Sequence, residues 1–165
     1  MSTDPLLSLK KAFPDAILEM ASTYNFPTVV VEKESLMAIF SFLYKPENGS
    51  FQFLTDLCGI HHPESTPPAL GVVYHLHSLQ NNVRLRIKAY TPVETATFPS
   101  LTGLFAAANW MERETYDFFG IHFEGHPNLI RILNEDNLSY FPMRKEYALE
   151  DDTRTDKQDD FFGRE

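Results

Sequence analysis

The sequence predicts an α+β fold: a two-layer domain with a mainly antiparallel sheet packed by helices, plus an extended C-terminal arm. Two observations support this prediction. The expected elements run helix, strand, helix, three strands and helix, and a link short enough for a hairpin joins the last two strands. Hydrophobic residues make up 43% of the 165 residues, which suffices for a packed core and excludes a largely disordered chain.

The first part of the chain predicts two helices around a strand. Residues 4–13 have an amphipathic pattern that ends at the Phe13-Pro14 step, because a residue before proline disfavours helical geometry. Residues 28–31 are all β-branched and mostly apolar, which is typical of a strand. Residues 32–44 place four apolar side chains on one helical stripe: Leu36, Ile39, Phe40 and Leu43.

After a turn at residues 47–50, three strands are expected at 51–57, 71–79 and 83–90. In the last of these, apolar residues alternate with Arg84, Arg86 and Lys88, which indicates one buried and one solvated face. The second and third strands should therefore be antiparallel neighbours.

Helical periodicity returns between residues 99 and 119, and Gly120 is suitably placed to cap the helix C-terminus. The residues expected on its buried face are Leu104, Ala108, Met111, Thr115 and Phe118. The opposite face should carry Trp110, Arg113 and Asp117 together. An ordinary solvated face explains this set, and so does a protein interface, because Trp and Arg are enriched at binding hot spots.

Residues 1–147 are expected to form one domain, and residues 148–165 an acidic extended tail. From Glu150 to Glu165 there are seven acidic and three basic residues, and the first apolar pair is Phe161-Phe162. Such a segment buries too little surface to offset its ordering entropy, so it is expected to become ordered on a partner or to stay loose.

Charge and composition exclude several functions. A net charge of −9 argues against binding nucleic acid or anionic lipid through a basic face. The single cysteine, Cys58, permits neither an internal disulfide nor a cysteine-ligated iron–sulfur cluster. The seven glycines do not cluster into a phosphate-binding loop. The start of the chain lacks signal-peptide features and the apolar run at 36–44 is too short to span a bilayer, so a cytoplasmic protein is expected.

The six histidines suggest a metal site only weakly. His122 and His126 have the spacing of helical zinc ligands, but Gly125 and Pro127 interrupt a helix there. His75 and His77 are expected on one strand face, and no third ligand with convincing spacing accompanies them. Ordinary interior or surface histidines are the favoured interpretation.

The region from about residue 102 to 147 strongly resembles the C-type subunit, also called the 30-kilodalton or J-type subunit, of respiratory complex I. The matching signature comprises Glu112, Arg113, Glu114, Tyr116, Asp117, Gly120, Ile121, Phe123, Gly125, His126, Pro127, Leu129, Arg131, Ile132 and Leu133. A closing element follows at Pro142, Met143, Arg144, Lys145, Glu146 and Tyr147, in which Met143 and Glu146 depart mildly from the usual leucine and aspartate. The resemblance of residues 27–90 is compatible but unspecific.

The resemblance implies a structural subunit that has no catalytic or cofactor-binding residues of its own. FMN, iron–sulfur clusters and quinone would lie in partner subunits. This chain would pack on subunits D and B of a NADH–quinone oxidoreductase, which are its quinone-site and its cluster-bearing subunit. The complex would stand at the cytoplasmic face of the bacterial inner membrane and couple electron transfer to proton translocation. An equivalent subunit of a membrane-bound hydrogenase or a ferredoxin-dependent quinone oxidoreductase is the close alternative.

The resemblance also implies roles for particular residues. Trp110, Glu114 and Tyr116, with Arg113 and Asp117, would form the junction between core and interface together with the turn at 125–127. Arg131, Arg144, Lys145 and the acidic tail would lie along the quinone-site subunit. A free-standing enzyme that uses the histidines with Glu112 or Glu114 as acid–base groups is a further alternative from another class.

Overall fold

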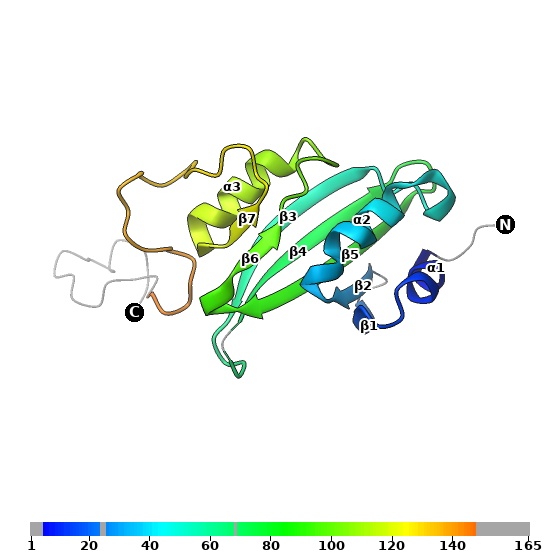
Figure 1. Ribbon diagram of the computed structural model, residues 1–165, viewed down its shortest axis with the longest axis horizontal. Coiled ribbons are helices and arrows are strands. Elements are labelled where there is room, and N and C mark those ends of the chain that lie inside the picture. The colour runs from blue at the N-terminus through cyan, green and yellow to red at the C-terminus, as the bar shows by residue number, and fades with distance from the viewer. Residues whose placement is uncertain (1–4, 24–25, 68, 148–165) are drawn as a thin grey trace, which may run out of the picture.

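The structure, a computed structural model, describes residues 5–23, 26–67 and 69–147, so the expected tail at 148–165 lies outside the described residues (Figure 1). Five strands form one sheet in the order β1-β2-β5-β4-β3. Their bounds are β1 Ile17–Thr23, β2 Phe26–Val31, β3 Phe53–His62, β4 Ala69–Ser78 and β5 Val83–Pro92. The α-helices are α1 Pro5–Ala12, α2 Leu36–Tyr44 and α3 Ala108–Phe119. Short 3₁₀ turns occupy Lys33–Ser35, Pro46–Asn48 and Val93–Thr95.

Helices α2 and α3 lie over the same face of the sheet (Figure 1). Phe40 of α2 contacts Tyr74 of β4 with ring centroids 4.9 Å apart. Gly59 of β3 pairs with Val72, and a Cβ atom added at Gly59 would meet the ring of Phe119 of α3. The sheet therefore has a covered core face and an outer face that carries the polar residues of β4 and β5.

The expected α+β class and the antiparallel hairpin of β4 and β5 are confirmed. Ten residue pairs join these strands, from Ala69↔Pro92 to Ser78↔Val83. The predicted stripe of α2 is also confirmed, because its four apolar side chains are fully buried. Burying four such side chains contributes about 1.5–3 kcal/mol each to the core.

The sheet differs from the prediction at its other end, because β1 was not expected. Its sequence is rich in residues that do not favour strands, and it forms a strand by pairing with β2 from Ile17↔Val31 to Thr23↔Phe26. In addition, β2 pairs with β5 in parallel, so the sheet is mixed. Both features are decided by tertiary pairing rather than by local pattern.

The predicted helix at 99–119 begins too early, because α3 starts at Ala108. Residues 97–99 instead form β6 (Thr97–Pro99), which pairs in parallel with β7 (His122–Glu124). Phe105 donates its backbone N–H to the carbonyl of Leu101 in an isolated turn, and both side chains are buried. Strands of three residues give too short a pattern to be recognised in the sequence. Among the described residues, no helix is long and apolar enough to cross a membrane.

Candidate protein interface

Residues 120–147, here called the arch, turn back across α3 after the helix ends (yellow to orange in Figure 1). The αL residue Gly120 ends the helix, with φ +71°, and donates its N–H to the Tyr116 carbonyl as predicted. Met143 of the arch donates its backbone N–H to the carbonyl of Phe118 at 3.1 Å. Helix α3 is therefore held between the sheet and the arch, and three of its charged side chains, Glu112, Arg113 and Asp117, have hydrogen-bond partners inside the chain.

Asp117 is the centre of this arrangement, and its location corrects the predicted helix face. Its carboxylate is fully buried rather than exposed beside Trp110 and Arg113. It accepts backbone N–H groups at 2.8–3.1 Å from three successive arch residues: Ile132, Leu133 and Asn134. Burial opposes ionisation, but these bonds together with Arg131 outweigh it and hold the pKa of Asp117 well below its usual range.

Arg131 completes the same network from the arch. Its Nη1 donates to Asp117 Oδ1 at 2.7 Å and to the Asp117 carbonyl at 2.9 Å. Its Nη2 donates to the carbonyls of Leu138 at 2.7 Å and Tyr140 at 3.1 Å. The side chain is 9% exposed. Arg131 thus ties both ends of the 131–140 loop to α3.

A second arginine holds the end of the arch against the helix C-terminus. Arg144 Nε donates to the carbonyl of Phe119 at 2.7 Å. The guanidinium groups of Arg131 and Arg144 lie 5.1 and 4.9 Å from the ring centroid of Phe141. A Cβ atom at Gly120 would clash with that ring, so the close approach requires glycine there.

Glu112, on the sheet side of α3, is also fully buried, although no buried role was expected for it. Its Oε1 accepts the N–H of Leu101 at 2.6 Å and its Oε2 accepts the hydroxyl of Ser100 at 2.7 Å. Burial raises the pKa of Glu112 to about 7 in spite of these two bonds. The carboxyl group fixes the chain that leads from β6 into α3.

Arg113 and His126 hold the first half of the arch. Arg113 donates from Nε to the carbonyl of Ile130 at 3.1 Å and from Nη2 to that of Arg131 at 3.0 Å. The His126 ring donates from Nε2 to the carbonyl of Asn109 at 3.0 Å and accepts the N–H of Asn128 at Nδ1. His126 lies between Gly125, at φ +83°, and Pro127. The turn predicted at 125–127 therefore anchors the arch to the start of α3.

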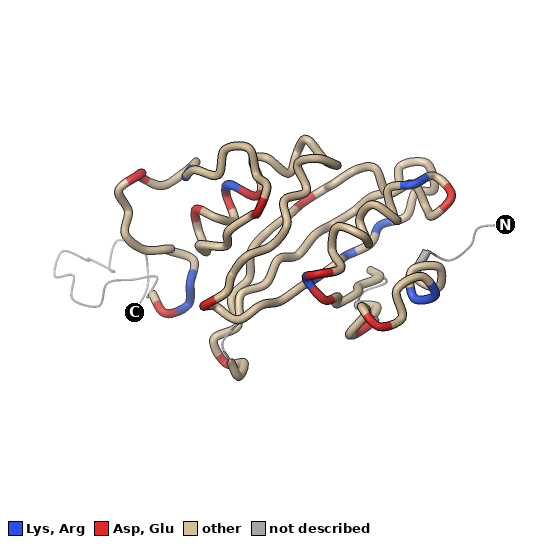
Figure 2. Tube along the Cα trace, in the orientation of Figure 1, with Lys and Arg blue, Asp and Glu red and all other residues tan. Residues whose placement is uncertain are grey.

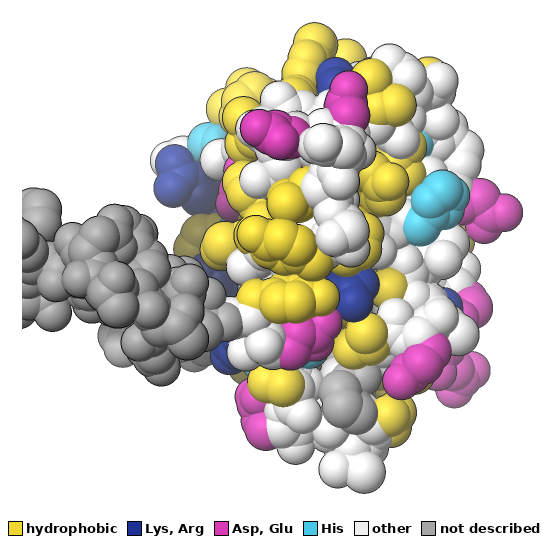
Figure 3. Space-filling model, turned by 90° about the vertical axis from the view of Figure 1, so that its left-hand side faces the viewer, with side chains coloured by type: hydrophobic (Ala, Val, Ile, Leu, Met, Phe, Trp, Pro, Cys, Tyr) yellow, Lys and Arg dark blue, Asp and Glu magenta, His cyan; other side chains and the backbone are white. Residues whose placement is uncertain are grey.

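Several large apolar side chains remain exposed around this framework. Trp110 is 60% exposed on α3, and Ile130 and Leu133 are 51% and 64% exposed on the arch. Figure 3 views this end of the molecule and shows hydrophobic side chains gathered across it. The exposed large hydrophobic residues of α3 and the arch, here called the apolar surface, are Trp110, Ile130, Leu133, Tyr140, Met143 and Tyr147. Apolar groupings of this kind mark binding surfaces.

The other signature residues lie in or beside the same unit. Glu114 is exposed on α3, and Tyr116 is half-buried with its ring 6.2 Å from that of Phe141. The rings of Tyr147 and Tyr140 are 5.0 Å apart. Pro142 is half-buried in the arch, whereas Lys145 is exposed beside it. The structure thus brings all of the signature positions together around α3 and the arch.

His61 belongs to this unit, although no pattern in the sequence pointed to it. Its Nδ1 accepts the backbone N–H of Lys145 at 3.0 Å, across 84 residues of sequence. Burial and the neighbouring Arg144 and Lys145 lower the pKa of His61, against the opposing effect of Glu146. No local pattern links β3 to the end of the arch, so this contact required the folded structure.

The other histidines and Cys58 do not assemble into a reactive centre. Within the described part of the chain, no three His, Cys, Asp or Glu side chains are grouped so as to hold a metal ion. His122 is exposed, whereas His126 bonds to the backbone. Cys58 is exposed at the surface, yet partial burial of its sulfur together with Asp56 raises the pKa of the thiol, which disfavours the reactive thiolate.

Comparison with known proteins shows the family to which the chain belongs. Residues 29–153 match the family model described as the 30-kilodalton subunit of respiratory-chain NADH dehydrogenase. A C-type subunit of the NADH-quinone oxidoreductase of Rhizobium etli is 37% identical over 153 residues, which cover 90% of this chain and 80% of the relative.

Two solved structures share the fold. A trypsin-resistant fragment of Nqo5 superposes with a TM-score of 0.66 at 32% identity and covers 76% of this chain and all of the fragment. A chain of an archaeal membrane-bound sulfane sulfur reductase reaches a TM-score of 0.73 at 21% identity, over 87% of this chain and 84% of that chain, and shows the fold alone. By its family match and its close relative, the chain belongs to the family of the 30-kilodalton, or C-type, subunit of respiratory-chain NADH dehydrogenases.

Proposed function

We propose that this chain is a cofactor-free structural and assembly subunit in the peripheral arm of a NADH–quinone oxidoreductase. The observation that carries the proposal is the apolar surface, which is displayed on a segment fixed by internal hydrogen bonds. A pre-ordered surface loses little conformational entropy when a partner binds, which favours stable assembly. The surface exposes Trp110 on α3, and Trp is one of the residue types enriched at hot spots.

The proposed partners are the subunits that correspond to D and B of complex I. In that position the chain would hold the quinone-site subunit and the cluster-bearing subunit in fixed geometry, without carrying electrons itself. NADH oxidation through FMN, the iron–sulfur clusters and quinone reduction would belong to the partners. The complex would lie at the cytoplasmic face of the inner membrane, and residues 148–165 would extend from the domain along the quinone-site subunit.

The internal bonds of the signature residues support two different roles, one in shaping the arch and one in contacting the partner. Asp117, Arg131 and Arg144 shape the arch, since their charged groups are engaged within the chain. Trp110 and Leu133, whose side chains face outward, would make the contact itself. Arg131 and Arg144 would thus act on the quinone-site subunit through the shape of the arch.

The test is to tag the chain in its host, solubilise the membranes gently and identify the co-purifying subunits. Leu133→Ala and Trp110→Ala should each weaken assembly by about thirtyfold or more and lower the yield of intact complex, because hot-spot truncation costs about 2 kcal/mol or more. Leu79→Ala is the matched control, since Leu79 is 66% exposed but lies between β4 and β5, away from the arch. Equal yields from the Leu133 and Leu79 variants would refute the proposed surface.

The equivalent subunit of a membrane-bound hydrogenase or of a ferredoxin-dependent quinone oxidoreductase is the second candidate. The fold shared with a chain of the archaeal sulfane sulfur reductase is compatible with it. Co-purification separates the two candidates: flavin- and NADH-binding subunits support the NADH enzyme, and a nickel–iron subunit supports the hydrogenase.

A further inference from the structure

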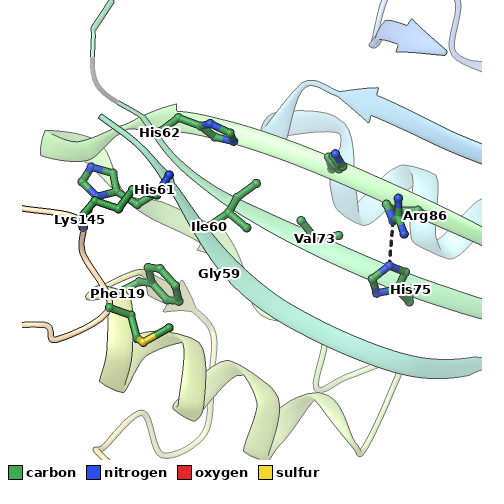
Figure 4. Close-up of a pocket in the computed structure, with 11 residues that line it drawn as sticks. Gly59, Ile60, His61, His62, Val73, His75, Arg86, Phe119 and Lys145 are labelled. Atoms are coloured by element: carbon green, nitrogen blue, oxygen red, sulfur yellow. Dashed lines mark hydrogen bonds between the residues drawn. The ribbon is translucent and has the colours of Figure 1, made fainter. Parts of the chain in front are cut away.

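A groove of about 510 Å³ runs from the outer face of the sheet over the edge of β3 to the end of the arch (Figure 4). Its outer-face part is formed by residues of β3, β4 and β5, including Ile60, Val73 and Lys88. Phe119 of α3 and Met143 and Lys145 of the arch close it beyond β3. The groove is separate from the internal network of Asp117 and adjoins the apolar surface at Met143.

One cation in this groove is held in a fixed orientation. Arg86 Nε donates to His75 Nε2 at 2.8 Å (dashed in Figure 4), and His75 Nδ1 lies 3.4 Å from a carboxylate oxygen of Asp56. The Arg86 guanidinium also lies 4.8 Å from the ring centroid of Phe26. Three strands, β2, β3 and β4, thus contribute one residue each to a clamp on Arg86 of β5.

The clamp leaves the outer end of Arg86 available. Among the described residues, the structure gives no hydrogen-bond or ion-pair partner to its Nη1 and Nη2 atoms. Burial and the adjacent Arg86 lower the pKa of His75, against the opposing effect of Asp56, so the ring stays neutral and accepts the Nε–H bond. A guanidinium fixed in this way presents two parallel donors to a carboxylate with little loss of entropy.

The charge in the groove is of one sign. Lys88 and Lys145 line it together with Arg86, and within the described residues their ammonium groups form no ion pair. None of the described residues that line the groove is acidic. The groove is therefore locally positive, although the net charge of the chain is −9. The acidic positions are scattered over helices, loops and strand ends (Figure 2).

Apolar side chains lie between these cations. Ile60 and Val73 come from the outer face of the sheet, and Phe119 and Met143 from beyond the β3 edge. A small inorganic anion would leave this apolar part uncovered, whereas a peptide can place a hydrophobic side chain there and carboxylates beside it. The length of the groove across two layers favours an extended segment of chain.

We infer that this groove docks an acidic segment of a partner subunit, with carboxylates on Arg86, Lys88 and Lys145 and an apolar side chain over Val73 and Phe119. The inference rests on the proposed function in that it requires assembly with other subunits, and it adds the chemistry of one contact. The groove would set specificity and orientation through charge, while the apolar surface supplies hydrophobic contact area.

The test uses the tagged full-length chain in its host, with the photo-reactive residue p-benzoylphenylalanine in place of Ile60. After irradiation, the complex is purified and the cross-linked peptides are identified by mass spectrometry. We expect a product with a partner segment in which Asp and Glu predominate. Its yield should fall about tenfold in the double variant Arg86→Gln, Lys88→Gln, a change that corresponds to about 1.4 kcal/mol.

Arg84→Gln is the matched control, because Arg84 is an exposed residue of the same strand outside the groove, and it should leave the yield unchanged. Lys145→Gln, at an exposed position, provides a second variant should loss of Arg86 impair folding, and it should lower the yield as well. Raising the salt concentration before irradiation should weaken the cross-link of the wild-type groove.

A product with a neutral or basic segment, with lipid or with a second copy of this chain would overturn the inference. So would the absence of a product from a complex that still co-purifies. In each of these cases the proposed function stands, because co-purification is measured in the same sample. A wild-type chain that co-purifies with no other subunit would instead refute the proposed function and the docking inference with it.

Discussion

Asp117 and Arg131 form a buried ion pair, 2.7 Å apart, that joins the last turn of α3 to the middle of the arch. The carboxylate is fully buried, and three backbone N–H groups of the arch point to it. The guanidinium in turn binds two carbonyls at the far end of the same loop. One pair of side chains therefore satisfies five backbone groups of a loop that has no regular secondary structure.

Asp117→Asn should destabilise the protein by about 3 kcal/mol, because it leaves Arg131 buried without its counter-charge. The amide also replaces one acceptor oxygen by a donor that opposes the arch N–H groups. Urea unfolding measures the change, and Asp136→Asn, at an exposed acid of the arch, is the control. A difference between the two variants below about 0.5 kcal/mol would contradict the role assigned to the pair.

Glu112 should make the protein less stable as pH rises from 4.5 to about 7. Its pKa is higher in the folded than in the unfolded state, so in this window the unfolded chain has released a proton that the folded chain retains. The free energy of unfolding therefore falls with rising pH, by up to about 3 kcal/mol, and levels off above about pH 7.

Glu112→Gln should remove that slope and keep the fold. The glutamine can accept the Leu101 N–H and donate to the Ser100 hydroxyl, as the protonated acid does. The measurement is the difference in unfolding free energy between wild type and variant across roughly pH 4–8. A constant difference would show that Glu112 does not titrate in this range.

Alanine substitutions at three glycines should distinguish the stability cost of backbone strain from that of a steric clash. Gly103→Ala should have little effect, since a Cβ atom there meets nothing within 4 Å. Gly125→Ala has the same open space but φ +83°, and should cost about 1–2 kcal/mol. Gly120→Ala adds a clash with Phe141 to its φ of +71° and should cost more than either. Thermal or urea unfolding gives the order, and an equal cost at 120 and 125 would argue against the packing of Phe141.

Arg113→Ala should lower the yield of assembled complex, because it releases the backbone of Ile130 and Arg131 from α3. The apolar surface would then lose part of its fixed shape. Quantification of the co-purified partner subunits measures the effect, with Arg84→Gln as a control for loss of one surface charge.

Deletion after Tyr147 should lower the yield of assembled complex by a separate route, since it removes the acidic tail proposed to lie along the quinone-site subunit. The same co-purification measures it, and normal amounts of intact complex would contradict this proposal.

The sequence was sufficient to identify core residues in elements that have a long periodic pattern and bury only one face. The stripe of α2 and the alternation in β5 identified core residues, because one side of each element contacts the core and the other contacts water. The pattern misled in α3, where Asp117 was expected on a face with Trp110 and Arg113, but the arch covers its carboxylate. No helical pattern indicated that Glu112 is buried either, because its partners, Ser100 and Leu101, lie outside the helix.

The sequence by itself determined the fold class, the β4–β5 hairpin, the αL cap at Gly120 and, through its signature residues, the family. Those features depend on local geometry or on residues in fixed order. The tertiary structure decided the strand β1, the parallel pairing of β2 with β5, the Asp117–Arg131 pair and the His61–Lys145 contact. In each of these features, the two partners become neighbours only when the chain has folded. Local periodicity does not indicate which distant group will pair with a buried charge or with a strand edge.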